Sequence, residues 1–183
     1  GDIGLGVPGL VTFVGGVGSG ISVAIATGTS DPLVAGPYPN MDLNAVLVVS
    51  GAQTATIEMS QTGFSNPGQA LEFATRFGGV LSAPAGSSML LEAFVNLDDG
   101  LFSTSGTNVS SHLLGTGAAV FGDWVFAPLD ASYSVTLRAV VTFAGSGTVS
   151  LDLATQVPEP ATLALFGIGL LGLGLAAPRR FSA

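Results

Sequence analysis

Short segments in which apolar and polar residues alternate recur along the chain, and glycine-rich turns separate them. In one of them, Ile21, Val23 and Ile25 alternate with serine and alanine, which is the period of a half-buried β-strand. Eight to ten short strands of this kind predict an antiparallel β-sandwich, of jelly-roll or immunoglobulin-like type. The predicted strands are residues 10–14, 21–27, 43–50, 54–61, 70–77, 89–97, 109–114, 119–127, 133–143 and 148–155.

Two pairs of these segments are predicted to be hairpins. Residues 43–50 and 54–61 are separated by three residues, and residues 133–143 and 148–155 are separated by four. Short turns that contain glycine join antiparallel neighbours. We therefore expect each pair to lie side by side in one sheet. In the last hairpin, the residues predicted to share one face are Val135, Leu137, Ala139 and Val141.

One segment is ambiguous between strand and helix. Glu72 and Arg76 are four residues apart and would pair on a helix, but Leu71 and Phe73 fit a strand. We expect a strand, because Gly78-Gly79 follows and the neighbouring segments alternate with a period of two.

Composition excludes several classes of function. Only 9% of residues are charged, there is no lysine, and there is no cysteine, which excludes disulfides and thiolate metal sites. All twelve acidic residues lie before residue 161, where only Arg76 and Arg138 oppose them. Such an acidic domain repels nucleic acid, so we expect no nucleic-acid partner. The apolar content of 48% excludes a disordered chain.

The composition changes sharply after residue 156. Pro158, Glu159 and Pro160 cannot continue a strand, and residues 161–177 that follow contain no charge. At about 1.5 Å per residue, a helix over 161–177 is about 25 Å long, and it is apolar on every side, which favours a transmembrane helix over a buried core helix. The predicted anchor residues are Ala161, Leu165, Phe166, Leu170, Leu171 and Leu175.

Two arginines end the apolar segment. Arg179 and Arg180 are expected to stay on the cytoplasmic side, which places the preceding domain outside. The sequence thus predicts a β-sandwich ectodomain over residues 1–156 and a tail over residues 157–183.

The tail resembles the sorting signal of PEP-CTERM proteins. Residues 157–162, the apolar run and the terminal arginines all match that pattern, although the basic cluster has only two arginines and Pro178 precedes it. The resemblance implies an exported protein of a Gram-negative bacterium that makes exopolysaccharide, with an exosortase-type membrane enzyme as partner. Pro158, Glu159 and Pro160 are then a recognition site. The protein is expected either in the inner membrane with its ectodomain in the periplasm, or at the cell surface or outside the cell after processing.

Catalysis is not expected. His112 is the only histidine, and although Ser110 and Ser111 lie beside it, no GxSxG elbow is present. Glycosidase chemistry needs two facing carboxylates, and the acids on separate predicted strands are more often only solvated. Those acids are Glu58, Glu72 and Glu92. We therefore expect a protein that is not an enzyme and that needs no cofactor.

Two weaker binding sites are predicted. Asn96, Asp98 and Asp99 place several oxygens on one loop, as calcium sites do, although Asp-Gly is also an ordinary turn. Trp124 and Phe121, with Phe126 nearby, have the side chains of a surface that stacks on sugars. Because aromatic residues dominate sandwich cores, we favour core packing for this cluster.

The leading hypothesis is a non-enzymatic, envelope-anchored or secreted surface protein with a structural or adhesive role in extracellular matrix or biofilm. A first alternative is an accessory subunit of a membrane complex or extracellular filament, held in membrane lipid by an uncleaved tail helix. In that case the glycine-rich residues 1–30 could add a strand to a neighbouring sheet, by self-association or with other subunits. A second alternative is a carbohydrate-binding module with polysaccharide as its partner.

Overall fold

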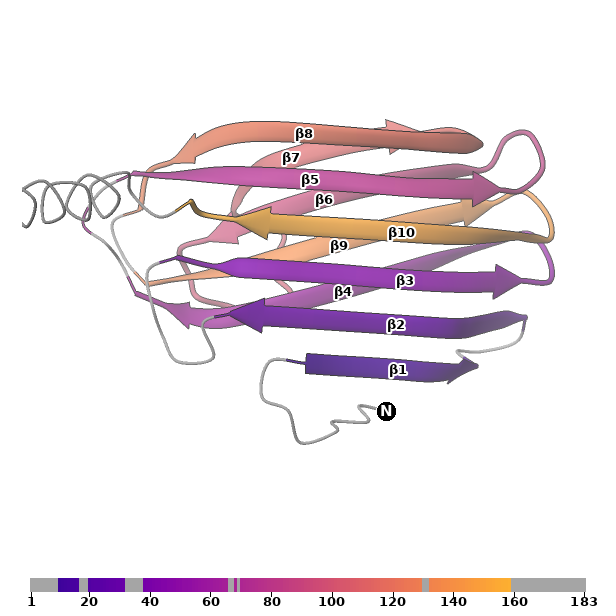
Figure 1. The fold of residues 1–183 in the computed structure, drawn as a ribbon, viewed down its shortest axis with the longest axis horizontal. Helices are drawn as coiled ribbons and strands as arrows, with labels where there is room; N and C mark the ends of the chain where they lie inside the picture. The colour runs from indigo at the N-terminus through magenta and orange to yellow at the C-terminus, as the bar shows by residue number, and fades with distance from the viewer. Residues whose placement is uncertain are drawn as a thin grey trace, which may run out of the picture.

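The computed structural model describes residues 10–16, 20–31, 38–65, 68, 70–129 and 132–158, which form ten strands in two antiparallel sheets (Figure 1). Each predicted segment overlaps one strand, including the ambiguous residues 70–77, so the all-β sandwich is confirmed. The strands are β1 Leu10–Gly16, β2 Ile21–Asp31, β3 Asn40–Val49, β4 Gln53–Phe64, β5 Leu71–Ser82, β6 Ser88–Asn96, β7 Thr107–Leu114, β8 Gly117–Ala127, β9 Tyr133–Phe143 and β10 Gly147–Gln156.

The strand order identifies the type of sandwich. The six-stranded sheet has the order β1-β2-β3-β10-β5-β8, and the four-stranded sheet has the order β4-β9-β6-β7. Among the last eight strands, β3 pairs with β10, β4 with β9, β5 with β8, and β6 with β7. A long ribbon of strand pairs gives this pattern when it rolls into two sheets, which is the jelly-roll arrangement. β1 and β2 extend one edge of the six-stranded sheet.

Both predicted hairpins are wrong. β3 and β4 lie in different sheets, and so do β9 and β10, so each short connection carries the chain across the sandwich. The reason is that every one of these strands has an apolar face. Stacking them face to face buries both apolar rows against each other, whereas a hairpin would place both rows on one face and leave them to be covered by another layer. The predicted inward row of β9, from Val135 to Val141, is confirmed and fully buried.

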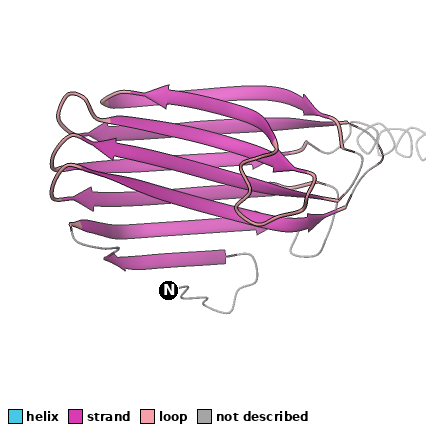
Figure 2. Ribbon diagram, turned by 180° about the vertical axis from the view of Figure 1, so that it is seen from behind, coloured by secondary structure: helices cyan, strands magenta, loops and turns pink. Residues whose placement is uncertain are grey.

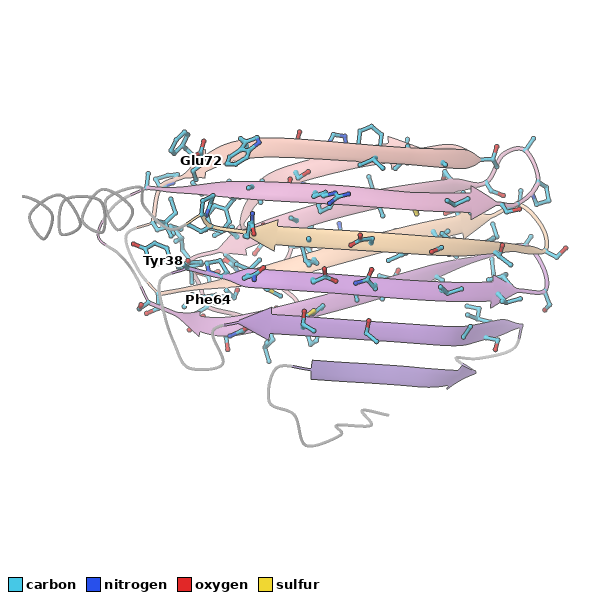
Figure 3. The ribbon with its side chains drawn as sticks, viewed as in Figure 1. Tyr38, Phe64 and Glu72 are labelled. Carbon is cyan, nitrogen blue, oxygen red and sulfur yellow. The ribbon has the colours of Figure 1, made fainter. Side chains whose placement is uncertain are left out.

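The core lies between the sheets and contains a cluster of aromatic rings at one end. Tyr133 stacks on Phe64 with ring centroids 5.4 Å apart and meets Phe73 edge-on at 6.2 Å. Burial, and secondarily the neighbouring Tyr38, raises the pKa of the Tyr133 hydroxyl. Figure 3 shows Tyr38 and Phe64 at this end of the sandwich. These contacts hold the start of β9 against both sheets.

The outer face of the four-stranded sheet is partly covered by the loop between β6 and β7, which lies over the strands in the view from behind (Figure 2). The Ser134 hydroxyl donates to the carbonyl of Gly100 in this loop at 2.8 Å, and Ser134 is buried as a result. Beside it, Arg138 donates through Nε and Nη2 to Oε2 of Glu92, at 2.9 and 2.7 Å. The guanidinium also lies over the ring of Phe94, 5.0 Å from its centroid.

The strand register fixes the positions of the three candidate glutamates relative to this ion pair. Glu58 and Glu92 lie on either side of Arg138 in the register of the four-stranded sheet. Glu72 belongs to the other sheet, on β5. Glu92 is therefore held by an arginine, and Glu72 does not face the other two across a cleft.

No helix among the described residues is long and apolar enough to cross a membrane. The helix expected over residues 161–177, with its anchor residues and the two terminal arginines, lies outside the described part of the chain, as do Glu159 and Pro160. Pro158 follows β10 as an exposed residue.

Candidate functional site

The outer face of β8, an edge strand of the six-stranded sheet, carries three large exposed apolar side chains. Val120, Trp124 and Phe126 have 69%, 64% and 66% of their surface exposed. The strand alternates, and the residues between them point toward the opposite sheet, where Phe121 packs against the core. The core packing that the sequence favoured is correct for Phe121 and wrong for Trp124 and Phe126.

The two residues predicted together as sugar contacts lie on opposite faces of β8. Phe121 and Trp124 are three positions apart, so the alternation of a strand sends their side chains in opposite directions. Phe126 shares the outward face with Trp124. Sequence reasoning left Phe126 out of the predicted contact pair, although the period of two would have found it.

Charged side chains of β5 flank this aromatic pair. In the register of the two strands, Glu72 pairs with Phe126, and Arg76 pairs with Gly122, two residues before Trp124. Figure 3 shows Glu72 at the end of β5 that lies beside β8. Arg76 is exposed, and because Gly122 has no side chain, the guanidinium has room beside the indole.

A shallow depression of 520 Å³ continues this face along β8 and across β5 to β10. It forms where Gly78 pairs with Val120 on one side and with Asp152 on the other, because glycine has no side chain to fill the space. At about 3.3 Å per residue, the stretch from Val120 to Phe126 is about 20 Å long. We call the outward-facing residues of β8 and its neighbours on this face the β8 platform. They are Val120, Trp124 and Phe126 of β8, Glu72 and Arg76 of β5, and Asp152 of β10.

The polar side of the platform is acidic. Asp42 of β3 lies near Asp152 of β10, and burial, followed by the charge of Asp152, raises the pKa of the Asp42 carboxyl. The side-chain amide of Asn44 donates to Asp42. This part of the sheet therefore offers oxygens that accept hydrogen bonds. They lie on the same outer face as the exposed aromatic rings, two and three strands away from β8.

A separate polar cluster joins the edge strands of the two sheets. Oδ2 of Asp123, on β8, accepts hydrogen bonds from the Ser110 hydroxyl at 2.5 Å and lies 2.7 Å from Nε2 of His112, both on β7. The His112 ring stacks on Phe121 with centroids 4.2 Å apart. In a catalytic triad the serine hydroxyl pairs with the imidazole. Here the serine hydroxyl pairs with the carboxylate, so the cluster joins β7 of one sheet to β8 of the other through hydrogen bonds.

The carboxylate of this link should give the fold a pH dependence. The hydrogen bond from Ser110, and secondarily that from His112, holds the pKa of Asp123 below its usual value despite an opposing effect of burial. Its stabilising contribution is thus complete above the unfolded-state pKa of about 3.9 and is lost as pH falls through the folded value.

We expect Asp123→Asn to lower the urea midpoint at pH 6 and to differ less from the wild type near pH 3. Asp98→Asn, on an exposed loop, is the control. An equal deficit at both pH values would contradict this role.

The predicted calcium ligands take part in hydrogen bonds of the loop after β6. Oδ1 of buried Asn96 accepts from the backbone N–H of Asp98 at 3.2 Å, and Oδ1 of Asp99 accepts from the N–H of Gly63 at 2.8 Å. No group of three or more histidine, aspartate or glutamate side chains is placed to hold a metal within the described ranges. Calcium binding by this loop stays a prediction.

The end of the chain matches a family model. Residues 156–180 fit the PEP-CTERM protein-sorting motif. The chain is a PEP-CTERM domain-containing protein. The motif marks it as exported, and the match covers the tail, whereas the sandwich with the β8 platform precedes it. No curated protein matches this chain.

Several solved structures resemble the fold of this PEP-CTERM protein. A structure described as "CBM4 structure and function" has a TM-score of 0.46 and 12% identity, over 85% of this chain and 90% of its own. TmCBM61 in complex with β-1,4-galactotriose has a TM-score of 0.37 and 10% identity, over 81% and 88%. A family 11 carbohydrate-binding module of Clostridium thermocellum has a TM-score of 0.34 and 10% identity, over 86% and 92%. At these identities the likeness concerns the fold alone.

Proposed function

We propose that this protein is a non-enzymatic, exported adhesive protein of the cell envelope or extracellular matrix that binds polysaccharide on the β8 platform. The observation that carries the proposal is the outward projection of Trp124 and Phe126, each about two-thirds exposed, from an edge strand. Clustered exposed apolar side chains mark interaction surfaces, and two aromatic rings on one face of a strand suit stacking on successive sugar rings.

The charges around the aromatic pair favour a neutral polysaccharide. Arg76 donates hydrogen bonds, and Glu72 and Asp152 accept them, so the platform complements hydroxyl groups. The acids outnumber the single arginine, and Asp42 lies beside Asp152. An acidic polysaccharide would therefore be repelled. The platform is open, which suits the side of a long chain better than a single small sugar.

Sorting by the tail is the second part of the proposal. An exosortase-type enzyme would recognise Pro158, Glu159 and Pro160 while the apolar residues 161–177 lie in the membrane. The sandwich would then face the periplasm before processing and the cell surface or matrix after it. A second function, as a subunit of an extracellular assembly, is favoured by the free side of β4 at the edge of the four-stranded sheet.

Substitution of the aromatic pair should remove binding without affecting the fold. We expect Trp124→Ala to weaken binding to a neutral polysaccharide about tenfold, since the loss of about 1.4 kcal/mol of ring stacking corresponds to that factor. The double variant with Phe126→Ala should show no measurable binding. Binding is measured by depletion from solution with a panel of neutral and acidic polysaccharides, and circular dichroism checks the fold.

The matched control is Leu113→Ala. Leu113 is 71% exposed on β7 of the other sheet, so it removes a similar exposed surface away from the platform. Equal loss of binding in the control, or full binding by the folded double variant, would overturn the role of the platform.

A further inference from the structure

One side of the sandwich has unequal sheets. The six-stranded sheet continues past β3 with β2 and β1, which Figure 1 shows at its free edge, whereas the order of the four-stranded sheet ends at β4. β4 lies against β2, since a Cβ added to Gly28 would be 2.7 Å from Sδ of Met59. Within the described residues, no strand of the four-stranded sheet lies beyond β4 to face β1.

Among the described residues, the free side of β4 is unprotected over residues 53–59. Beyond them the loop after β6 covers the end of the strand, where the N–H of Phe102 donates to Oγ of Ser60 and Oδ1 of Asp99 accepts from the N–H of Gly63. β4 pairs with β9 on one side, so its other side presents backbone N–H and C=O groups to a partner. Proteins usually protect such edges with lysine, proline or a bulge. Residues 53–60 of β4 contain neither lysine nor proline, carry one charge at Glu58, and keep regular register with β9.

An apolar groove of 510 Å³ runs beside this edge, between β2, β3 and β4. Its apolar lining includes Val23, Leu43, Leu47, Ala55, Ile57 and Met59. The alternate residues of β4, such as Thr54 and Thr56, are exposed and polar. A groove with an apolar floor and an unpaired strand as its wall fits an extended segment whose apolar residues alternate, because the backbone can pair while every second side chain enters the groove.

We propose that residues 3–7 of a second copy of the chain bind this groove and add to β4 as a further strand. In that segment Ile3, Leu5 and Val7 alternate with Gly4 and Gly6, which is the required pattern. Residues 3–9 separate this segment's start from β1 and span at most about 25 Å when extended, a reach sufficient for a contact with a neighbouring copy. The chain thus supplies both the strand and the groove that receives it.

Geometry excludes the simpler pairing of two β4 strands. In such a dimer, β4 of the second copy would lie beside β4 of the first. The apolar face of that second β4 would still be covered by β3 of the second copy. The space that this β3 would occupy is already taken by β2 and β1 of the first copy. A single inserted segment has no second sheet attached at that point, so it fits beside β4 and beneath β1 and β2. Repeated insertion would link copies head to tail.

Cysteine cross-linking tests the proposal, because residues 1–183 contain no cysteine and give no background. Full-length Leu5→Cys and Ile57→Cys variants are mixed in mild detergent and oxidised. We expect a mixed dimer to form roughly tenfold faster than with Leu5→Cys and Leu113→Cys, since a bound strand holds the two sulfurs at a high effective concentration. Leu113 lies on β7, at the other edge of the same sheet.

A synthetic peptide of residues 1–9 should slow the mixed dimer by competing for the groove. Equal rates for the groove pair and the control pair would overturn the proposal. A double variant with both cysteines in one chain that forms only an internal disulfide, even at high concentration, would also overturn it, because the segment would then fill its own groove. Circular dichroism shows that each variant keeps the sandwich, and polysaccharide binding by the β8 platform is not needed for any arm of the test.

Discussion

Removal of residues 159–183 is expected to move the protein from the membrane fraction to the soluble exported fraction. The apolar run 161–177 would form a helix of about 25 Å, close to the thickness of a bilayer's hydrocarbon core, and it lies within the sorting motif. The other long uncharged stretch, residues 3–30, contains β1 and most of β2, which pair in the six-stranded sheet. Fractionation of cells that express each form, with detection of the sandwich, measures the change.

The end point of the deletion matters for its interpretation. Val157 is 7% exposed within the core, and its N–H donates to the carbonyl of Pro39 at 2.9 Å, so it belongs to the sandwich. A deletion that begins at residue 159 keeps this contact, whereas an earlier one would also destabilise the fold.

A triple substitution separates anchoring from recognition. Replacement of Pro158, Glu159 and Pro160 by alanine keeps the apolar run and the arginines, so we expect membrane retention with an uncut mass in a host that has the sorting enzyme. Equal membrane retention of the deleted and full chains would show that the tail is not the anchor.

The sequence predicted where the strands lie but not which strands pair. Alternation identifies the buried face of β3 or β4 from local residues alone, because each side chain needs only to be in or out. A short connection such as residues 50–52 can make either a hairpin or a crossing between sheets. The choice depends on which arrangement covers both apolar faces, and that requires all ten strands at once.

The error at β8 has a specific physical cause. The sequence favours core packing for all three aromatic residues because aromatics dominate sandwich cores, but alternation lets only one face of β8 enter the core, and Phe121 shares that face with the polar Asp123. Asp123 can lie on the inner face because β8 is an edge strand, and Ser110 and His112 of the facing edge strand satisfy its carboxylate. Sequence alone does not reveal those partners, since they lie more than ten residues away on a strand of the other sheet.

Loss of the arginine from the Glu92–Arg138 pair is expected to cost about 3 kcal/mol of folding free energy. The side chain of Glu92 is only 9% exposed, and its Oε2 accepts two hydrogen bonds from the guanidinium. Arg138→Met keeps most of the packing over Phe94 but leaves the carboxylate buried without its partner. Urea unfolding followed by circular dichroism measures the loss.

The double variant Glu92→Leu with Arg138→Met should recover most of that loss, because a buried pair replaced by apolar residues of similar size leaves no uncompensated charge. Arg76→Met is the control, since Arg76 is exposed on the other sheet and its replacement should change stability by no more than about 0.5 kcal/mol. If the double variant is as unstable as the single one, the cost comes from packing at the centre of the sheet. If Arg138→Met alone is as stable as the wild type, Glu92 finds water in its place, and the ion pair does not stabilise this face of the sandwich.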